Sequence, residues 1–288
     1  MTTIDDAYRH CRAIAHKHGA NFSVGFRFLP RRKRRAVYAA YAYCRWADDI
    51  ADESEQRGAS SEQVYEQLAE WQAELEACYA GHPTQSITIA LADALQSFAI
   101  PKSAFIALID GCRQDMFKTR YETFDELLQY CELVASSISD ISLAIYGYRT
   151  DAAIAHGRNL ATALQLTNVT RDIGDDLTRN RVYIPQEELR RFGVSERDLF
   201  DRVESDAMRR LIEFQIDRAE SYFRLAEPLL SELSFDARFP TVLMGGVYAT
   251  VLARLRLAPL TALRKRLSLS SVEKMMVVVR RAVRPHFV

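Results

Sequence analysis

The stretch Pro30–Glu53 reads PRRKRRAVYAAYAYCRWADDIADE, and the fold prediction starts from it. A basic first turn is followed by almost unbroken apolar residues and then by carboxylates, which reverses the charge order that a helix dipole favours. Four polar residues are spaced by four, three and four positions: Tyr41, Arg45, Asp48 and Asp52. Such spacings place them on one face of a helix, where the two neighbouring carboxylates repel each other. We therefore expect a cation over this face.

A second stretch, Leu160–Leu177, repeats this arrangement as LATALQLTNVTRDIGDDL. Its polar residues are spaced by three, four and four positions: Gln165, Asn168, Asp172 and Asp176. The second aspartate pair follows the first by the same 124 residues. A single DxxxD on a helix usually marks a solvated face, whereas two copies in helices that look buried favour a metal site.

Four carboxylates in one low-dielectric cleft need compensating positive charge. Mg²⁺ prefers carboxylate and water oxygen, and it completes its coordination with phosphate oxygens of a substrate. Facing aspartate pairs in apolar surroundings therefore predict a cavity that binds a diphosphate with a long apolar chain.

The rest of the chain predicts an all-α protein. Apolar periodicity and the positions of the prolines indicate helical segments, and no run alternates as a strand. The expected ranges are 3–18, 30–52, 61–80, 84–99, 102–118, 124–146, 151–178, 195–233, 239–257 and 270–284. Short loops and the lack of a linker favour one domain over residues 1–288.

Composition narrows the functional classes. Of the 288 residues 48% are hydrophobic, and 38 Lys and Arg balance 38 Asp and Glu. The zero net charge offers no global attraction for nucleic acid, and the run Arg31–Arg35 fits a solvated helix start better than a nucleic-acid site. Five scattered cysteines suggest neither a disulfide framework nor a zinc site. We expect a cytoplasmic protein.

Two segments carry a family resemblance: YAYCRWADDIADE (Tyr41–Glu53) and LQLTNVTRDIGDDLTRNRVYIPQEEL (Leu164–Leu189). They resemble the squalene/phytoene synthase family of head-to-head prenyl transferases, and the resemblance extends over essentially the whole chain. It implies an isoprenoid synthase fold, a single helical bundle around a central cavity, with two or three Mg²⁺ ions at the mouth. It also implies that two identical prenyl diphosphates are joined through a cyclopropyl diphosphate.

The resemblance assigns roles to individual residues. It implies that Asp48, Asp52, Asp172, Asp176 and Asn168 hold metal, and that Arg45, Arg171 and Tyr183 contact diphosphate. Tyr41 and Gln165 match inward-facing residues, and Tyr130 matches a tyrosine that assists proton loss. We expect Phe22 and Phe26 to contact prenyl chains. Ser136 and Ser139 stand where many members have glycine, so we expect a substrate to approach that helix less closely than in those members.

Substrate length and the end of the reaction stay open. The segment RWADDIADE is more similar to bacterial squalene-pathway (hopanoid) members, which favours farnesyl diphosphate, and the alternative is a phytoene synthase that uses geranylgeranyl diphosphate. A glycine-rich dinucleotide fingerprint is not found, so we expect no built-in nicotinamide domain, and the use of NADPH stays open. Rival hypotheses are a terpene cyclase, a chain-elongating prenyl transferase and a non-catalytic scaffold that binds prenyl diphosphate.

The C-terminal segment EKMMVVVRRAVRPHFV (Glu273–Val288) mixes apolar and basic residues. Ordinary packing of a terminal helix is the favoured interpretation. The alternative is peripheral contact with the inner membrane, which would receive an oily product. The oligomeric state cannot be predicted from the sequence.

Overall fold

The computed structural model describes residues 2–18, 25–56, 60–264 and 266–287, and for residues 52–56 it describes the backbone only. Within these ranges the chain forms helices and no β-strand, apart from isolated bridges between Arg120 and Val182 and between Tyr148 and Leu233. The all-α prediction is confirmed. In this part of the chain no helix is both long enough and apolar enough to cross a membrane.

The chain divides into two compact units. The first unit contains Met1–Phe117, Ser137–Ile154 and Ser231–Pro240. Its helices are α1 (Ile4–His18), α3 (Arg31–Gln56), α4 (Ser61–Tyr79), α5 (Ser86–Leu95), α6 (Lys102–Asp115) and α8 (Ser137–Tyr146).

The second unit contains Lys118–Ser136, Ala155–Leu230 and Thr241–Val288. Its elements are α7 (Phe124–Cys131), the π-turn η1 (Glu132–Ser136), most of α9 (Ala152–Arg171), α10 (Ile173–Thr178), α11 (Gln186–Phe192), α12 (Glu196–Phe200), α13 (Asp206–Ala226), most of α15 (Phe235–Leu257), the 3-10 turn η2 (Pro259–Leu263) and α16 (Ser271–Val283). The short helix α14 (Leu229–Glu232) spans the boundary between the units.

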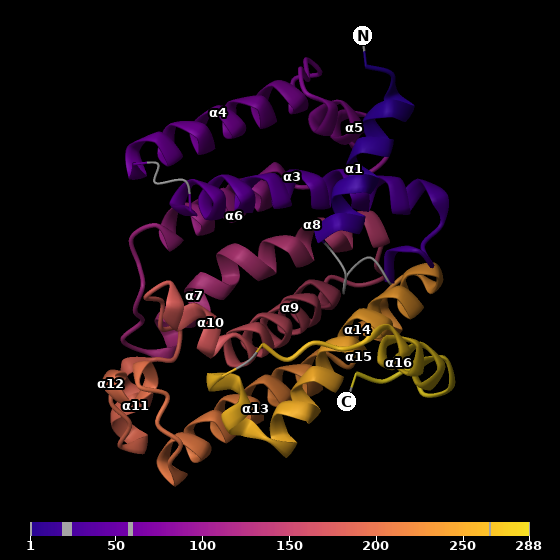
Figure 1. Cartoon of the computed structure of the whole chain (residues 1–288). Helices are drawn as coiled ribbons and strands as arrows, with labels where there is room; N and C mark the ends of the chain where they lie inside the picture. Colours follow the sequence, from indigo (N-terminus) through magenta and orange to yellow (C-terminus); the bar gives the residue numbers. More distant parts are fainter. Residues whose placement is uncertain (1, 19–24, 57–59, 265, 288) are drawn as a thin grey trace. The chain divides into compact units, whose positions relative to one another are not determined.

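Helix α3 is the core of the first unit. It packs against α1, α4, α5, α6 and α8, and Figure 1 shows it running alongside α4. Buried alanines on several of its faces allow these neighbours to approach closely. Tyr43 stacks on Trp71 of α4 with ring centroids 4.7 Å apart. The hydroxyl of Tyr43 donates to the Trp71 carbonyl, and the Trp71 indole donates to the Tyr43 carbonyl.

The basic first turn of α3 is explained by contacts within the first unit. Lys33 donates to Asp236 and to the carbonyl of Tyr146, both at 2.7 Å. Arg35 pairs with Asp5 of α1 at 2.8 Å. The guanidinium of Arg35 also lies 3.9 Å from the centroid of the Tyr8 ring. These cations therefore fasten α3 to its neighbours, which offsets their unfavourable position at a helix N-terminus.

A buried polar cluster joins α11 to α13 in the second unit. The Gln215 amide donates to Glu188 at 2.6 Å, and Arg218 forms an ion pair with the same carboxylate. Arg218 also lies 3.8 Å from the centroid of the Phe124 ring. Because Glu188 is only 3% exposed, these partners are what make its charge tolerable in the core.

Several predicted helix bounds differ from those of the structure. The segment predicted at 124–146 is interrupted by the π-turn η1, and the one predicted at 151–178 breaks after Arg171. The segment at 195–233 divides into α12, α13 and α14. The segment expected at 239–257 begins earlier, at Phe235, so that Pro240 lies inside α15 and not at its start. Helix α11 and the turn η2 were not predicted, because both are too short to show periodicity.

Candidate active site

The first predicted polar row lies on α3 as expected. Tyr41, Arg45 and Asp48 are partly exposed, whereas Cys44 and Ala47 between them are buried. The thiol of Cys112 on α6 donates to the Asp48 carboxylate, with 3.5 Å between sulfur and oxygen. Burial, and then the charge of Asp48, raises the pKa of Cys112 well above its ordinary value. The thiol therefore stays protonated and acts as a donor.

Arg45 is held by Asp49, a residue that the sequence analysis did not single out. Its Nε is buried and has no hydrogen-bond partner within the described residues. Burial opposes the charged form of Arg45, but the bond and charge of Asp49 outweigh it and raise the pKa. Arg45 is thus a permanent cation with an unused donor, which suits an anionic ligand.

Phe26 and Tyr41 meet in the first unit. Phe26 is buried, and its ring lies edge-on to Tyr41 at 6.2 Å and to Tyr38 at 6.1 Å between centroids. Two predicted site residues therefore share one aromatic cluster. Phe22 and the side chain of Asp52 lie outside the described residues, so their predicted roles stay predictions.

The second predicted polar row lies on α9 and α10 in the second unit. Gln165, Asn168, Asp172 and Asp176 are partly exposed in a segment whose other side chains are largely buried. The row crosses a break in the helix, because α9 ends at Arg171 and α10 begins at Ile173 (Figure 1). Asp172 occupies the break and is the N-cap of α10.

Two arginines bind Asp172. Arg171 Nε and Nη2 donate to its two carboxylate oxygens at 2.7 and 2.5 Å. Arg266 Nε lies 3.2 Å from Asp172 Oδ1. Arg171 is 4% exposed, so its charge is fixed inside the second unit, whereas Arg266 is largely exposed. Two positively charged side chains therefore lie beside the second aspartate pair, both at Asp172.

Asp176 is the most strongly perturbed acid of this row. Burial first, and then the charge of Asp172, raises the pKa of Asp176 to about 7. Arg181 and Arg179 lower it without cancelling the effect. The ionised form of this carboxyl therefore lacks sufficient positive charge in its surroundings, and a bound cation would supply it.

The side chain of Asn168 also indicates a site for a ligand or a cation. Its Oδ1 is buried and has no hydrogen-bond partner within the described residues, while its amide nitrogen lies 3.4 Å from Gln165 Oε1. Asn168 and Arg171 both hydrogen-bond to Tyr248, a buried residue of α15 that the sequence did not reveal. An unpaired buried carbonyl oxygen is costly unless a ligand or an ion completes it.

These observations test whether Mg²⁺ fits. The donors in the second unit are all oxygens, from Asn168, Asp172 and Asp176, which is the chemistry that Mg²⁺ prefers. Across the described ranges, no three His, Cys, Asp or Glu side chains gather closely enough to hold a metal ion by themselves. The residues present therefore fit an ion that takes only one or two carboxylates and fills its remaining positions with other oxygens.

Two predicted tyrosines meet in the second unit. Tyr130 of α7 stacks on Tyr183 with ring centroids 5.5 Å apart, and Tyr121 joins them at 5.6 and 5.8 Å. Backbone bonds from Val182 to Thr119 and from Gln186 to Tyr121 hold the two segments together. Tyr121 was not predicted, because it stands in a connecting segment without periodicity. Tyr121 and Tyr130 are buried and Tyr183 is partly exposed, and the three rings together form an aromatic wall.

The π-turn η1 follows Tyr130 closely and contains one of the two serines that replace glycine. Ser136 ends this turn and is 4% exposed, whereas Ser139 lies in α8 and is partly exposed. Single π-turns within α-helices often mark functional sites, because they shift the side chains that follow.

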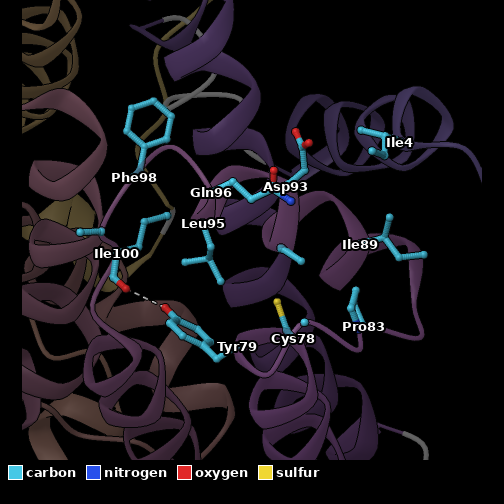
Figure 2. A pocket seen from close by; sticks show the side chains of 13 residues that line it. Ile4, Cys78, Tyr79, Pro83, Ile89, Asp93, Leu95, Gln96, Phe98 and Ile100 are labelled. Carbon is cyan, nitrogen blue, oxygen red and sulfur yellow. Dashed lines mark hydrogen bonds between the residues drawn. The ribbon is translucent and has the colours of Figure 1, made fainter.

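The first unit contains a cavity of about 570 Å³, and none of the site residues described above lines it. Figure 2 shows Tyr79 donating its hydroxyl proton to the Ile100 carbonyl, at 2.8 Å, along a largely apolar wall. Asp93, also in the lining, accepts a hydrogen bond from Tyr8. The lining contains none of the predicted site residues, and we assign it no role.

Comparison with known proteins gives consistent results. The model of a family described as squalene/phytoene synthase matches residues 15–273. The 15-cis-phytoene synthase of Synechococcus elongatus is 35% identical over 83% of this chain and 80% of its own. The phytoene synthase of Arthrospira platensis is 36% identical over the same shares of the two chains.

Solved structures show the same fold. A dehydrosqualene synthase crystallised with a ligand superposes with a TM-score of 0.87, at 24% identity, over 97% of this chain and 96% of its own. The squalene synthase HpnC from Alicyclobacillus acidocaldarius has a TM-score of 0.82 at 31% identity, over 88% of this chain and 94% of its own. The expected isoprenoid synthase fold is confirmed.

Proposed function

Because the chain belongs to the squalene/phytoene synthase family, whose members are prenyl transferases, we propose that it joins two identical prenyl diphosphates head to head through a cyclopropyl diphosphate. The observation that carries this proposal is the polar row of α9 and α10. An unpaired Asn168 oxygen and an acid with a strongly raised pKa, Asp176, stand beside the arginine-bound Asp172. This arrangement suits a diphosphate that arrives with divalent cations.

The proposed metal ligands are Asp48, Asp52, Asn168, Asp172 and Asp176. Mg²⁺ bound there would offset the negative charge of the departing diphosphate. That both aspartate pairs serve one reaction, within one domain over residues 1–288, is a hypothesis from the sequence resemblance. It is supported by the family match, which extends over both pairs.

The arginines hold the leaving group in this proposal. When the allylic C1–O bond breaks, its electron pair stays on the diphosphate, and charge-assisted hydrogen bonds stabilise the new negative charge. Arg45 offers a buried Nε without a partner, and Arg171 is fixed beside Asp172. Tyr183 and Gln165 would complete the contacts around the diphosphate and the reacting carbons.

The aromatic residues protect the cation that remains. The double bond of the second substrate attacks this allylic cation, and loss of a proton closes the cyclopropane ring. Faces of buried aromatic rings stabilise carbocations and exclude water. The wall of Tyr121, Tyr130 and Tyr183 meets this need, and the Tyr130 hydroxyl would assist the proton loss. Phe22, Phe26 and Tyr41 would contact the prenyl chains.

Two substrate lengths have specific support. The motif RWADDIADE and the 31% identity to a squalene synthase favour farnesyl diphosphate and a C30 product. The curated relatives at 35 and 36% identity carry the name phytoene synthase, which favours geranylgeranyl diphosphate and a C40 product. We propose farnesyl diphosphate as the substrate, with phytoene synthesis as the second candidate.

A substrate comparison tests these proposals. The purified protein is incubated with Mg²⁺ and either farnesyl or geranylgeranyl diphosphate, with and without NADPH, and the extract is analysed by mass spectrometry. A C30 product formed faster than a C40 product supports the proposed substrate, and dependence on NADPH would identify hydride as the final quencher. If neither substrate yields a hydrocarbon, an alcohol or a cyclopropyl diphosphate, the non-catalytic scaffold becomes the better hypothesis.

A further inference from the structure

Helix α16 of the second unit carries an exposed apolar stripe. Five apolar residues share one face of this helix, and each is 59–75% exposed: Val272, Met275, Met276, Val279 and Val283. On the opposite face, Val277 and Arg281 are buried. Isolated exposed apolar residues are common on proteins, but five of them in one continuous row on one helix indicate a contact surface.

The packing of α16 is complete without this stripe. Phe287 is fully buried against Gly245 of α15, where an added Cβ would collide with its ring. An added Cβ at Gly246 would come within 2.5 Å of Arg281 Nε. Arg281 also donates to the Phe287 carbonyl at 2.6 Å. These close contacts determine which face of α16 points inward. The stripe on the other face therefore stays exposed in the folded unit.

The charges beside the stripe are mostly positive. Arg280 and Arg284 are exposed, and no carboxylate pairs with either of them among the described residues. The nearby acid, Glu273, completes the capping box at Ser270 and forms an ion pair with Arg254. An apolar helix face flanked by unpaired arginines is complementary to a bilayer that contains anionic lipid.

We propose that this stripe and the two arginines form a peripheral membrane-binding surface, with α16 lying in the plane of an anionic bilayer. Apolar side chains enter the boundary between headgroups and acyl chains, and the arginines bind lipid phosphates. The proposal does not depend on the proposed catalytic function, because it concerns lipid binding by the folded protein alone.

Co-sedimentation with vesicles tests the proposal. We expect the protein to pellet with phosphatidylcholine vesicles that contain phosphatidylglycerol, and less with phosphatidylcholine alone. The double variant Met276→Gln, Val279→Gln should lower the partition coefficient on both vesicle types by about tenfold or more. The double variant Arg280→Gln, Arg284→Gln should lower it about tenfold on the anionic vesicles only, as should added salt.

A matched control separates this surface from exposed apolar residues in general. Leu257 at the end of α15 is 86% exposed and lies outside the stripe, so Leu257→Gln should bind vesicles like the unchanged protein. Circular dichroism of all variants checks that they are folded. Equal binding by the stripe variant and the unchanged protein would overturn the proposal.

Light scattering without vesicles gives a second readout. Met276→Gln, Val279→Gln should leave the molar mass in solution unchanged. Conversion of a dimer to a monomer by this variant would identify the stripe as an interface between two copies of the chain, and the membrane proposal would be wrong.

Discussion

Asp172 receives two hydrogen bonds from Arg171, the residue immediately before it, and does so at the break between α9 and α10. Adjacent side chains of a continuous helix point in different directions, and the break is what allows this pairing. The buried guanidinium orients the carboxylate and supplies positive charge next to the row of oxygens. Both features are suited to a site that receives an anionic leaving group together with its metal ions.

Replacement of Asp172 should stop catalysis, and circular dichroism checks that the variant is folded, because Arg171 loses the charge of its partner. Asp172→Asn keeps the size of the side chain and removes the charge, so we expect diphosphate release to fall at least about a hundredfold. The exposed neighbour Asp175 provides a matched control, and Asp175→Asn should stay near the unchanged rate. Retained turnover in Asp172→Asn would contradict the proposed metal site.

The pH dependence of stability should reveal Asp176. Its pKa is raised to about 7 in the folded protein from an ordinary value of 3.8, so between these values the folded state binds a proton that the unfolded state lacks. In metal-free protein, its contribution to the free energy of unfolding is therefore largest below this window and is lost as pH rises through about 7, by up to about 1.4 kcal/mol per pH unit.

Urea unfolding in the presence of a chelator measures this effect. The free energy of unfolding is compared near pH 5 and near pH 8 for the unchanged protein and for Asp176→Asn. The variant should show a smaller fall between the two conditions, because its side chain does not titrate. An identical fall in both proteins would mean that Asp176 has an ordinary pKa.

The sequence predicted most helices and the two acidic rows, because both follow from residue spacing. Helices α1, α4 and α16 begin and end within about one residue of the predicted bounds, since periodic apolar residues and polar caps mark their ends. The break at Asp172 was missed because the apolar pattern continues across it. Pro240 was placed at a helix start because proline usually lies in the first turn, whereas α15 begins five residues earlier and continues through it with the loss of one helical hydrogen bond.

The contacts that complete the candidate site are tertiary and have no sequence pattern. Cys112 and Tyr248 reach the two acidic rows from other helices. A spacing rule finds residues on one helix face but cannot find a residue that arrives from another helix. Cys112 and Tyr248 were therefore not predicted. Asp49 was missed although it lies four residues after Arg45 on α3, which is the spacing of a helix ion pair.

Gly174 should be required for the position of α10. A Cβ added there would lie 2.5 Å from the carbonyl oxygen of Leu263 in η2, and a backbone atom cannot move aside as a flexible side chain does. We expect Gly174→Ala to lower the free energy of unfolding by about 1–3 kcal/mol, as overpacking does. Thermal unfolding measures the change.

The control for Gly174→Ala is a glycine with open space around it. Gly81 has no atom within 4 Å of an added Cβ but has a positive φ of 84°, so Gly81→Ala should lose only the conformational part, about 1 kcal/mol. A loss for Gly174→Ala no larger than this would show that η2 can shift away from α10.

The aromatic wall gives a prediction about Tyr121. If its ring face stabilises the allylic cation, Tyr121→Leu should lower kcat about tenfold, while Tyr121→Phe, which keeps the ring, should stay within about twofold. Because Tyr121 is fully buried, Tyr121→Leu also leaves a cavity, and the loss of activity must be separated from a loss of stability. Tyr43→Leu is the matched control, since Tyr43 is equally buried and stacked, but on Trp71 in the first unit. Both leucine variants are measured well below their unfolding temperatures. Under these conditions Tyr43→Leu should keep its kcat. An equal fall of kcat in the two variants would show that Tyr121 acts only through packing.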